Sequence, residues 1–258
     1  PRDPATHRFR LVIYFCIPVH DEERTIGLLL WKIRKVMAEF GRDYRILAWN
    51  DGSSDGTGEV LERYRKHVPL DVLGSDRRIG VTRARERLLR EAVRLAPYPK
   101  RDVAVTLQGD FTEYPEDVVD MVKVIEGGAD IVTGFQEGAE GSPPRRVRFA
   151  RWLAPRLLGA TFDEAPVKDP FCGYRAYRII VLKKAFREVG DDPLVQREGW
   201  AGQVELLEKL VPHARRVEEV PMRIRYDIRR RESRFSPFRN LRGLLGLRGT
   251  EWPPEEAA

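Results

Sequence analysis

The stretch Asn50-Asp51-Gly52-Ser53-Ser54-Asp55-Gly56-Thr57 is the part of the sequence that best indicates the fold. It consists of turn-forming and helix-capping residues, and it follows an apolar segment at 44–49 that is typical of a buried strand. From residue 57 to about 67 the apolar positions take helical spacing, so a helix is expected there with its first turn directed back at the polar turn. A strand that passes through a polar turn into a helix is the repeating unit of an α/β sheet.

The same alternation of apolar and amphipathic segments continues on both sides of this unit. Residues 134–144 are expected to form a mobile loop, because they are rich in Gly and Glu, and residues 145–157 a basic helix with Phe149 and Trp152 on its apolar face. The order predicts one α/β domain with a Rossmann-like, mostly parallel central sheet flanked by helices. Strands are expected at 11–17, 44–49, 72–73, 103–107, 130–133 and 217–224, helices at 22–40, 57–67, 81–95, 115–126 and 203–210, and a strand and a helix between 174 and 186.

Composition limits the classes of protein that fit. The chain has 258 residues, of which 42% are hydrophobic, so extensive disorder is excluded. The longest apolar runs are shorter than the roughly 18–20 residues that a membrane-spanning helix needs, so no transmembrane helix is expected. Cys16 and Cys172 match neither a disulfide framework nor a metal-binding spacing, which favours reduced thiols in a cytoplasmic protein.

Positive charge is concentrated near the C-terminus. The net charge is +6, yet residues 215–248 alone contain eleven arginines against four acidic residues. In the tail at 229–258 apolar side chains lie among these arginines, which makes this segment basic and amphipathic. Such a tail fits nucleic acid, a phosphate-bearing ligand or an anionic membrane surface, and a plain solvated face is an equal alternative.

Polar clusters follow three of the predicted strands, at residues 18–22, 50–57 and 108–110. Ligands of open α/β sheets bind beyond the carboxyl ends of the strands. Each cluster alone could be an ordinary helix cap or turn. Three such clusters in succession indicate a ligand-binding cleft.

These clusters resemble the motifs of glycosyltransferase family 2, whose members have the GT-A fold and use nucleotide sugars. The family's Pro-x-x-Asn-Glu is similar to Pro18-Val19-His20-Asp21-Glu22, and its Asp-Asp-Gly-Ser-x-Asp-Gly-Thr differs from residues 50–57 at one position. The resemblance continues through Arg78-Ile79-Gly80 and Arg83-Ala84-Arg85 to the Asp-x-Asp position at 108–110. It implies an N-terminal extension at 1–10 and a GT-A domain at 11–228, with a nucleotide-sugar half at about 11–134 and an acceptor half at about 145–228.

The resemblance also implies roles for individual residues. Asp51 would accept hydrogen bonds from the base or ribose, while Asp55 is interpreted as a turn-forming and capping residue. Asp110 would act in catalysis by holding Mg²⁺ or Mn²⁺ against the departing diphosphate. The nucleotide slot would be lined by Pro18, Val19, His20, Asp21 and Glu22.

Gln108 departs from the family pattern, because it stands where the first Asp of Asp-x-Asp is usual. Its amide oxygen can bind a divalent metal, but it brings no charge. Metal affinity is therefore expected to fall unless Thr112 or Glu113 compensates. This leaves open a degenerate homologue that binds nucleotide without transfer.

The second half is most similar to the branch of the family that uses polyprenyl phosphates. That similarity rests on a basic helix after residue 144, on the stretch Asp169-Pro170-Phe171-Cys172-Gly173-Tyr174-Arg175-Ala176-Tyr177, and more loosely on residues 231–236. It implies that Asp169 lies near the acceptor and that Arg175, Arg229 and Arg234 hold phosphate. For Arg175 a salt bridge to a nearby carboxylate is the competing interpretation.

The expected function is an inverting transfer of a sugar from a nucleotide sugar to a polyprenyl phosphate, at the inner face of a membrane to which the tail binds peripherally. A hydroxyl acceptor would need a general base, for which Asp169 is the first choice and Glu198 and Glu205 follow. The alternatives are a soluble family 2 enzyme with a sugar or small-molecule acceptor, and a nucleic-acid-binding module. Phe149 and Trp152 could instead pack into the core or a homodimer interface.

Overall fold

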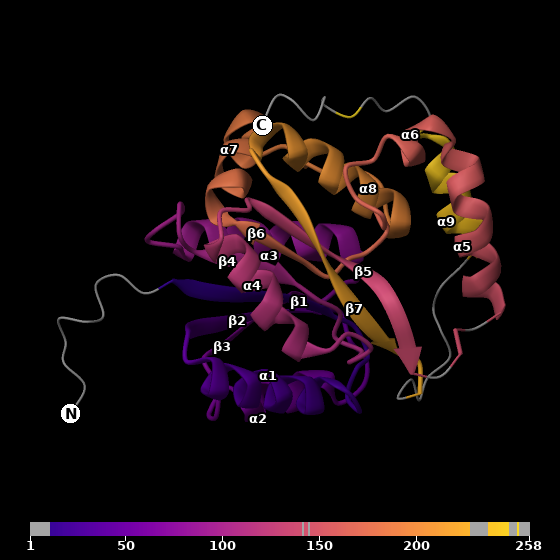
Figure 1. Ribbon diagram of the computed structural model, residues 1–258. Coiled ribbons are helices and arrows are strands. Elements are labelled where there is room, and N and C mark those ends of the chain that lie inside the picture. The colour runs from indigo at the N-terminus through magenta and orange to yellow at the C-terminus, as the bar shows by residue number, and fades with distance from the viewer. Residues whose placement is uncertain (1–10, 141, 144, 228–236, 248–251, 253–258) are drawn as a thin grey trace.

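The computed structural model describes residues 11–140, 142–143, 145–227, 237–247 and 252, which form a seven-stranded sheet between two layers of helices (Figure 1). The strand order is β3-β2-β1-β4-β6-β5-β7, and β6 alone runs antiparallel to its two neighbours. The mostly parallel α/β sheet predicted from the sequence is therefore confirmed. The strands are β1 (Val12–Val19), β2 (Asp43–Asp51), β3 (Leu70–Ser75), β4 (Val103–Thr106), β5 (Ile131–Glu140), β6 (Arg175–Arg178) and β7 (Val217–Arg225).

Both faces of the sheet are covered, so its central strand is apolar on both sides. Ile13, Phe15 and Ile17 of β1 face one core with α1, α2 and α4, while Tyr14 and Cys16 face a second core with α3, α7 and α8. This follows from the two-residue repeat of a strand. The helices are α1 (Ile26–Phe40), α2 (Thr57–Tyr64), α3 (Val81–Leu95), η2 (Pro115–Asp117), α4 (Val118–Glu126), α5 (Arg145–Leu158), α6 (Ala160–Asp163), α7 (Ile179–Val189), α8 (Gly199–Leu210), η3 (Val211–His213) and α9 (Pro237–Leu245).

The register of the central strands brings the polar clusters together. In β1 and β2 Val19 pairs with Asn50, and in β1 and β4 Cys16 pairs with Thr106. Because these strands are parallel, their carboxyl ends lie at one edge of the sheet. The segments that follow them therefore meet there, as expected for a ligand-binding edge.

The mobile loop expected at residues 134–144 is wrong for most of its length. Residues 134–140 continue β5, which pairs in parallel with β7 as far as Glu140 opposite Arg225, with an irregularity between Gln136 and Ala139. Pairing with a strand about 85 residues later in the sequence outweighs the low strand preference of Gly and Glu. The sequence pattern near residue 134 contains no sign of that partner.

Phe149 and Trp152 lie next to each other on the basic helix at 145–157, as expected, and the alternative that they pack into the core is wrong. In α5 the buried side chains are Val147, Ala150 and Ala154, whereas Phe149 and Trp152 are 55% and 56% exposed. Small residues face inward because α5 packs closely on α9. The large aromatic rings are left at the surface instead of entering the core.

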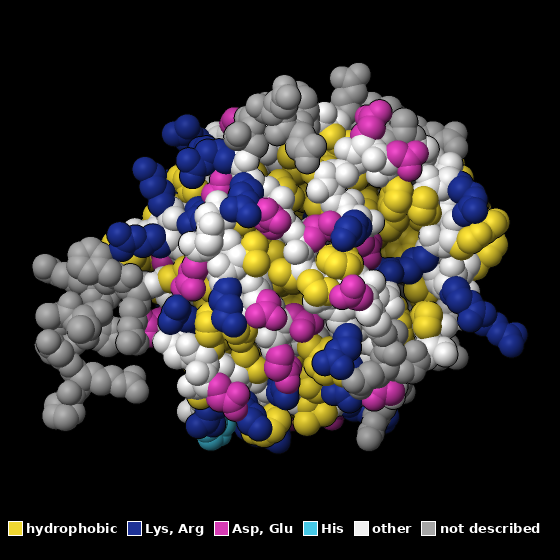
Figure 2. Space-filling view, viewed as in Figure 1, with side chains coloured by type: hydrophobic (Ala, Val, Ile, Leu, Met, Phe, Trp, Pro, Cys, Tyr) yellow, Lys and Arg dark blue, Asp and Glu magenta, His cyan; other side chains and the backbone are white. Residues whose placement is uncertain are grey.

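Exposed aromatic side chains and arginines therefore share the outer surface of α5. Trp152 lies 6.0 Å from Phe149 between ring centroids, and Arg156 lies over the Trp152 ring at 4.2 Å. Figure 2 shows hydrophobic and Lys or Arg side chains next to one another along the right-hand edge of the molecule, where α5 runs in Figure 1. We call Phe149, Trp152 and the exposed arginines of α5 the α5 surface. Within the described ranges, no helix is both long enough and apolar enough to cross a bilayer.

Candidate active site

A cleft of about 540 Å³ opens at the edge of the sheet where β1, β2 and β4 end. A volume of this size suits a small-molecule ligand. Seven of the residues predicted for the site line this cleft, and these are Pro18, Val19, His20, Glu22, Asp51, Gln108 and Asp110. Other lining residues include Arg78, Arg85, Phe171, Gly173, Glu198, Trp200, Gln203 and Asn240.

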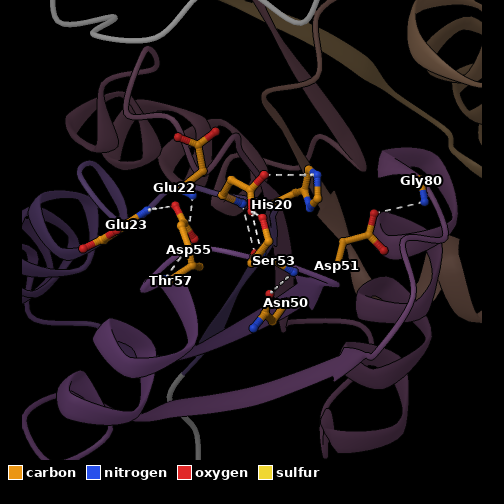
Figure 3. Close-up of polar contacts among 11 residues, drawn as sticks. His20, Glu22, Glu23, Asn50, Asp51, Ser53, Asp55, Thr57 and Gly80 are labelled. Carbon is orange, nitrogen blue, oxygen red and sulfur yellow. Dashed lines mark hydrogen bonds and ion pairs between the residues drawn. The ribbon is translucent and has the colours of Figure 1, made fainter.

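The first two polar turns are bound to each other through side chains (Figure 3). The Asp21 carboxylate accepts a hydrogen bond from the Ser54 backbone N–H at 2.7 Å, and the Glu22 N–H donates to Thr57 Oγ1 at 2.8 Å. Asp55 accepts from the N–H groups of Thr57 and Glu23, at 3.0 and 3.2 Å. Asp55 thus has the turn-forming contacts expected of it, and Asp21 serves the same junction outside the cleft lining. These bonds also explain why α1 begins only at Ile26 instead of near residue 22.

Asp51 is buried at the end of β2 and holds the loop that precedes α3. Its two carboxylate oxygens accept hydrogen bonds from the N–H groups of Ile79 and Gly80, at 2.7 and 3.0 Å. Gly52 allows this approach, because its φ is +62° and a Cβ there would lie 2.9 Å from the Arg78 backbone nitrogen. Each carboxylate oxygen has a second lone pair, so Asp51 can still accept from a ligand in the cleft.

Asp110 and Gln108 follow β4, and their hydrogen bonds go to Thr112 and Glu113, respectively. Asp110 accepts from the Thr112 hydroxyl at 2.7 Å, and Glu113 accepts from the Gln108 backbone N–H at 2.7 Å and from its side-chain amide at 3.4 Å. Burial raises the pKa of Glu113 to about 7, and the nearby Asp110 carboxylate adds to the rise, while the Gln108 N–H and Arg85 oppose it. Around neutral pH this buried acid therefore carries only part of a negative charge.

This set of side chains provides little charge for a divalent cation. Asp110 is one carboxylate, Gln108 contributes a neutral amide, and no group of three His, Cys, Asp or Glu side chains suited to a metal occurs in the described part of the chain. Magnesium-like ions are commonly held by one or two carboxylates together with ligand phosphates. The donor set therefore fits an ion that binds together with a phosphate-bearing ligand, held on the protein side by Asp110.

Asp169 and Arg175 lie outside the cleft lining. Asp169 forms an ion pair with Arg151 at 2.9 Å and accepts a hydrogen bond from the Phe171 N–H at 3.1 Å. The fully buried Arg175 donates to the backbone carbonyls of Gln203 and Pro170, at 2.9 and 2.6 Å, instead of pairing with a carboxylate. Its guanidinium is occupied in joining β6 to α8. Arg229 and Arg234 lie outside the described residues.

Glu198, just before α8, lines the cleft, although it was expected only as a second choice of base. The backbone of residues 194–197 before it is held by two buried acids, because Glu86 accepts from two of its N–H groups and Glu205 from the other two. Glu198 itself accepts from the Thr82 N–H at 3.3 Å. Glu205 is thus occupied in the fold, and Glu198 lines the cleft at the start of α3.

Two lining residues that the sequence reasoning missed, Trp200 and Asn240, join the tail helix α9 to the cleft. Asn240 accepts a hydrogen bond from the Trp200 N–H at 3.0 Å, and Trp200 stacks on Phe171 with 5.1 Å between ring centroids. Gly199 turns the chain between Glu198 and Trp200 with a φ of +63°. A signal for Asn240 was present in the sequence, since it is an amide among apolar residues and arginines, but nothing linked it to a position about 40 residues earlier.

Comparison with known proteins supports this description of the fold. The family model for glycosyl transferase family 2 matches residues 14–186. Polyprenol monophosphomannose synthase of Mycolicibacterium smegmatis is 26% identical over 232 residues, covering 85% of this chain and 80% of that protein. Undecaprenyl-phosphate 4-deoxy-4-formamido-L-arabinose transferase of Edwardsiella ictaluri is 27% identical over 170 residues, covering 65% of this chain and 49% of that protein. The chain therefore spans about half the length of the latter relative.

Solved structures show the same fold. Glucosyl-3-phosphoglycerate synthase from Mycobacterium tuberculosis, in complex with Mn²⁺, UDP-glucose and phosphoglyceric acid, superposes with a TM-score of 0.62 at 17% identity. The alignment covers 94% of this chain and 81% of that one. At 17% identity this structural similarity supports the fold and nothing further.

Proposed function

The chain belongs to glycosyl transferase family 2, and from that membership we propose that it transfers a sugar from a nucleotide-sugar donor to a polyprenyl phosphate at a membrane surface. One observation supports this most directly. The same cleft contains Asp51 and Asp110 together with Asn240 of α9, and α9 also carries the strongly exposed Phe238. This arrangement supports a donor site that lies next to a surface suited to a lipid-linked acceptor.

The donor would lie across the ends of β1, β2 and β4. Asp51 has free acceptor capacity for a base or ribose, and Pro18 to His20 line the same part of the cleft. A divalent ion bound with the donor would supply positive charge at the diphosphate, and Asp110 would hold it. The sugar would then lie toward Trp200 and Gln203.

The acceptor is inferred from the α5 surface and α9. Aromatic side chains beside arginines are typical of helices that lie in the plane of a membrane, where the rings enter the interface and the guanidinium groups meet lipid phosphates. Arg145, Arg146 and Arg148 are exposed next to Phe149. We infer a peripheral position on the cytoplasmic face, with the isoprenoid chain in the bilayer and its phosphate directed to the cleft.

The reaction would be a single displacement with inversion. An oxygen of the acceptor phosphate attacks the anomeric carbon, the bond from that carbon to the donor diphosphate breaks, and the bonding electrons remain on the nucleoside diphosphate. A phosphate anion needs no base for this attack. The ion pair of Asp169 with Arg151 is compatible with that, since Asp169 would orient an arginine near the acceptor instead of taking a proton.

The test is a donor panel of UDP-, GDP- and dTDP-sugars with Mn²⁺, Mg²⁺ or EDTA, each with and without a polyprenyl phosphate. We expect one donor to be consumed only when the lipid phosphate is present. Asp110→Ala should lower the rate at least about 100-fold, because it removes the carboxylate that would hold the divalent ion at the donor diphosphate. Asp120→Ala, at an exposed position of α4, is the matched control. Equal rates in the two variants would contradict the assignment of Asp110.

A hydroxyl acceptor is the second candidate, and the position of Glu198 in the cleft favours it. A hydroxyl must lose a proton as it attacks, so a base typically contributes about 10²- to 10⁴-fold to the rate. Glu198→Gln should then lower kcat by that factor. With a phosphate acceptor the same variant should keep most of its kcat, which separates the two candidates.

A further inference from the structure

Arg85, on the second turn of α3, is a buried cation that lines the cleft. Its side chain is 3% exposed, and within the described part of the chain its Nε makes no hydrogen bond. Burial lowers the pKa of its guanidinium, and the opposing effects of Tyr177 and Glu113 are smaller. An arginine in this state has lost its hydration without gaining a full set of partners.

A buried guanidinium without a full set of partners destabilises the folded chain unless an anion binds to it. Buried charges are normally paired and hydrogen-bonded, because removing an ion from water costs several kcal/mol. Arg175, two residues beyond Gly173, also has a buried Nε without a hydrogen bond in the described part of the chain, but its two terminal nitrogens donate to carbonyl oxygens. Arg85 has a similar depth of burial but faces the ligand cleft instead.

The absence of a side chain at Gly173 lets Arg85 and Gln203 approach each other at the cleft. A Cβ at Gly173 would lie 3.1 Å from Arg85 Nη2 and 3.3 Å from Gln203 Nε2, so two groups of N–H donors approach one point on the backbone. Both side chains line the cleft. Their donors would suit the oxygens of an anionic group.

The balance of charge around the cleft favours the same interpretation. Its lining includes Glu22, Asp51, Asp110 and Glu198, against two described guanidinium groups, of which Arg78 is exposed and Arg85 is buried. A diphosphate placed beside Asp110 meets a like charge. Gln108 contributes no charge for a metal ion, and Arg85 is the buried one of the two guanidinium groups that the described residues place in the cleft lining.

We propose that Arg85 is a catalytic residue that binds the diphosphate of the nucleotide sugar and takes up the negative charge that develops as it leaves. This rests on the proposed function, and it assigns to the protein a part of the charge stabilisation that a metal alone would otherwise supply. As the bond between the anomeric carbon and the diphosphate oxygen breaks, its electron pair stays on that oxygen. Charge-assisted hydrogen bonds from Arg85 strengthen as this charge grows.

The experiment measures binding by calorimetry in EDTA for wild type, Arg85→Met, Arg85→Lys and Arg87→Met. Arg87 is an exposed arginine on the same helix and outside the cleft lining, so it is the matched control. The probes are UDP, GDP, inorganic pyrophosphate, the nucleosides uridine and guanosine, and a short-chain polyprenyl phosphate. Thermal unfolding of each variant reports whether the fold is intact.

We expect Arg85→Met to bind the diphosphate probes about 10- to 100-fold more weakly than wild type, the usual range for a charge-assisted contact. Arg85→Lys should recover part of the loss, nucleoside binding should not change, and the Tm of Arg85→Met should not fall. Equal diphosphate affinity in Arg85→Met and Arg87→Met would overturn the proposal. So would a loss confined to the polyprenyl phosphate, which would make the acceptor the source of the anion.

Failure of the proposed function gives a different pattern. If wild type and Arg87→Met bind no nucleotide or nucleotide sugar, with or without metal, the glycosyl donor is not the ligand and the assignment to its diphosphate falls with it. If pyrophosphate still binds to wild type in that case and is lost in Arg85→Met, Arg85 is an anion site of some other ligand, and its proposed role at the donor diphosphate is overturned.

Discussion

Replacement of Glu113 by Gln should stabilise the protein, and by more as the pH rises. Glu113 is 4% exposed, and burial raises its pKa from 4.5 to about 7. An acid with a raised pKa in the folded state favours folding while it is protonated, below about pH 4.5, and that contribution is lost as the pH rises through 7. The Gln side chain has nearly the same shape, carries no charge, and can still accept the Gln108 N–H that Glu113 binds at 2.7 Å.

The size of the effect follows from the interval between the two pKa values. At about 1.4 kcal/mol for each pH unit, the contribution of Glu113 to the unfolding free energy falls by roughly 3 kcal/mol between pH 4.5 and pH 8, and Glu113→Gln lacks this loss. The advantage of the variant should be less than about 1 kcal/mol at pH 5 and about 3 kcal/mol at pH 8. For a chain of this length that corresponds to a Tm difference on the order of 10 °C at pH 8.

The assay is thermal unfolding followed by circular dichroism at pH 5, 6, 7 and 8, in EDTA and without nucleotide, so that no ligand stabilises the cleft. Glu62→Gln is the control, because Glu62 lies at the surface of α2 and its ion pair with Arg65 is exposed. We expect its Tm difference from wild type to stay within about 2 °C at each pH. A difference for Glu113→Gln that does not change between pH 5 and pH 8 would refute the argument, as would a variant less stable than wild type at pH 8.

Two further predictions concern the outer helices. Phe149→Ser combined with Trp152→Ser should weaken binding to anionic vesicles about 10- to 100-fold in a sedimentation assay, because two half-exposed rings are removed from the membrane interface. Trp31→Ser on α1 is the control and should leave vesicle binding unchanged. If the double variant binds vesicles normally but no longer forms a dimer, the α5 surface is an interface between copies of the chain. Gly199→Ala should lower the free energy of unfolding by about 1–3 kcal/mol in a denaturant titration. The reason is that Gly199 has a φ of +63° and that a Cβ there would overlap the Asn240 side chain. Unchanged stability would contradict the contact between α9 and the start of α8.

Local residue chemistry explains which parts of the fold could be predicted. The helix expected at 81–95 has the bounds of α3, and the turn at 50–57 forms around Asp55, because side chains of short reach satisfy the backbone next to them. The positions of Asp51 and Asp110 followed from their place directly after strands. These local features depend on residues that are neighbours in the sequence, so the sequence pattern could predict them.

Contacts between distant segments could not be predicted in this way. The length of β5 depends on β7, and the orientation of α5 depends on the small side chains that meet α9. The resemblance implied that Arg175 holds phosphate, but its two terminal nitrogens donate to the carbonyl oxygens of Pro170 and of Gln203 in α8. Glu198 reaches the cleft because Glu86 and Glu205 hold the loop before it, which no spacing in the sequence expresses.

The hydrogen bond from Trp200 to Asn240 changes where the functional unit ends. A cut made at the last residue of β7 would preserve all seven strands and still take a wall of the cleft away. Exchange of C-terminal segments between relatives would for the same reason alter the cleft as well as the outer surface of α9. Under the proposed function, a new lipid-binding surface on α9 would come together with a new contact at the cleft.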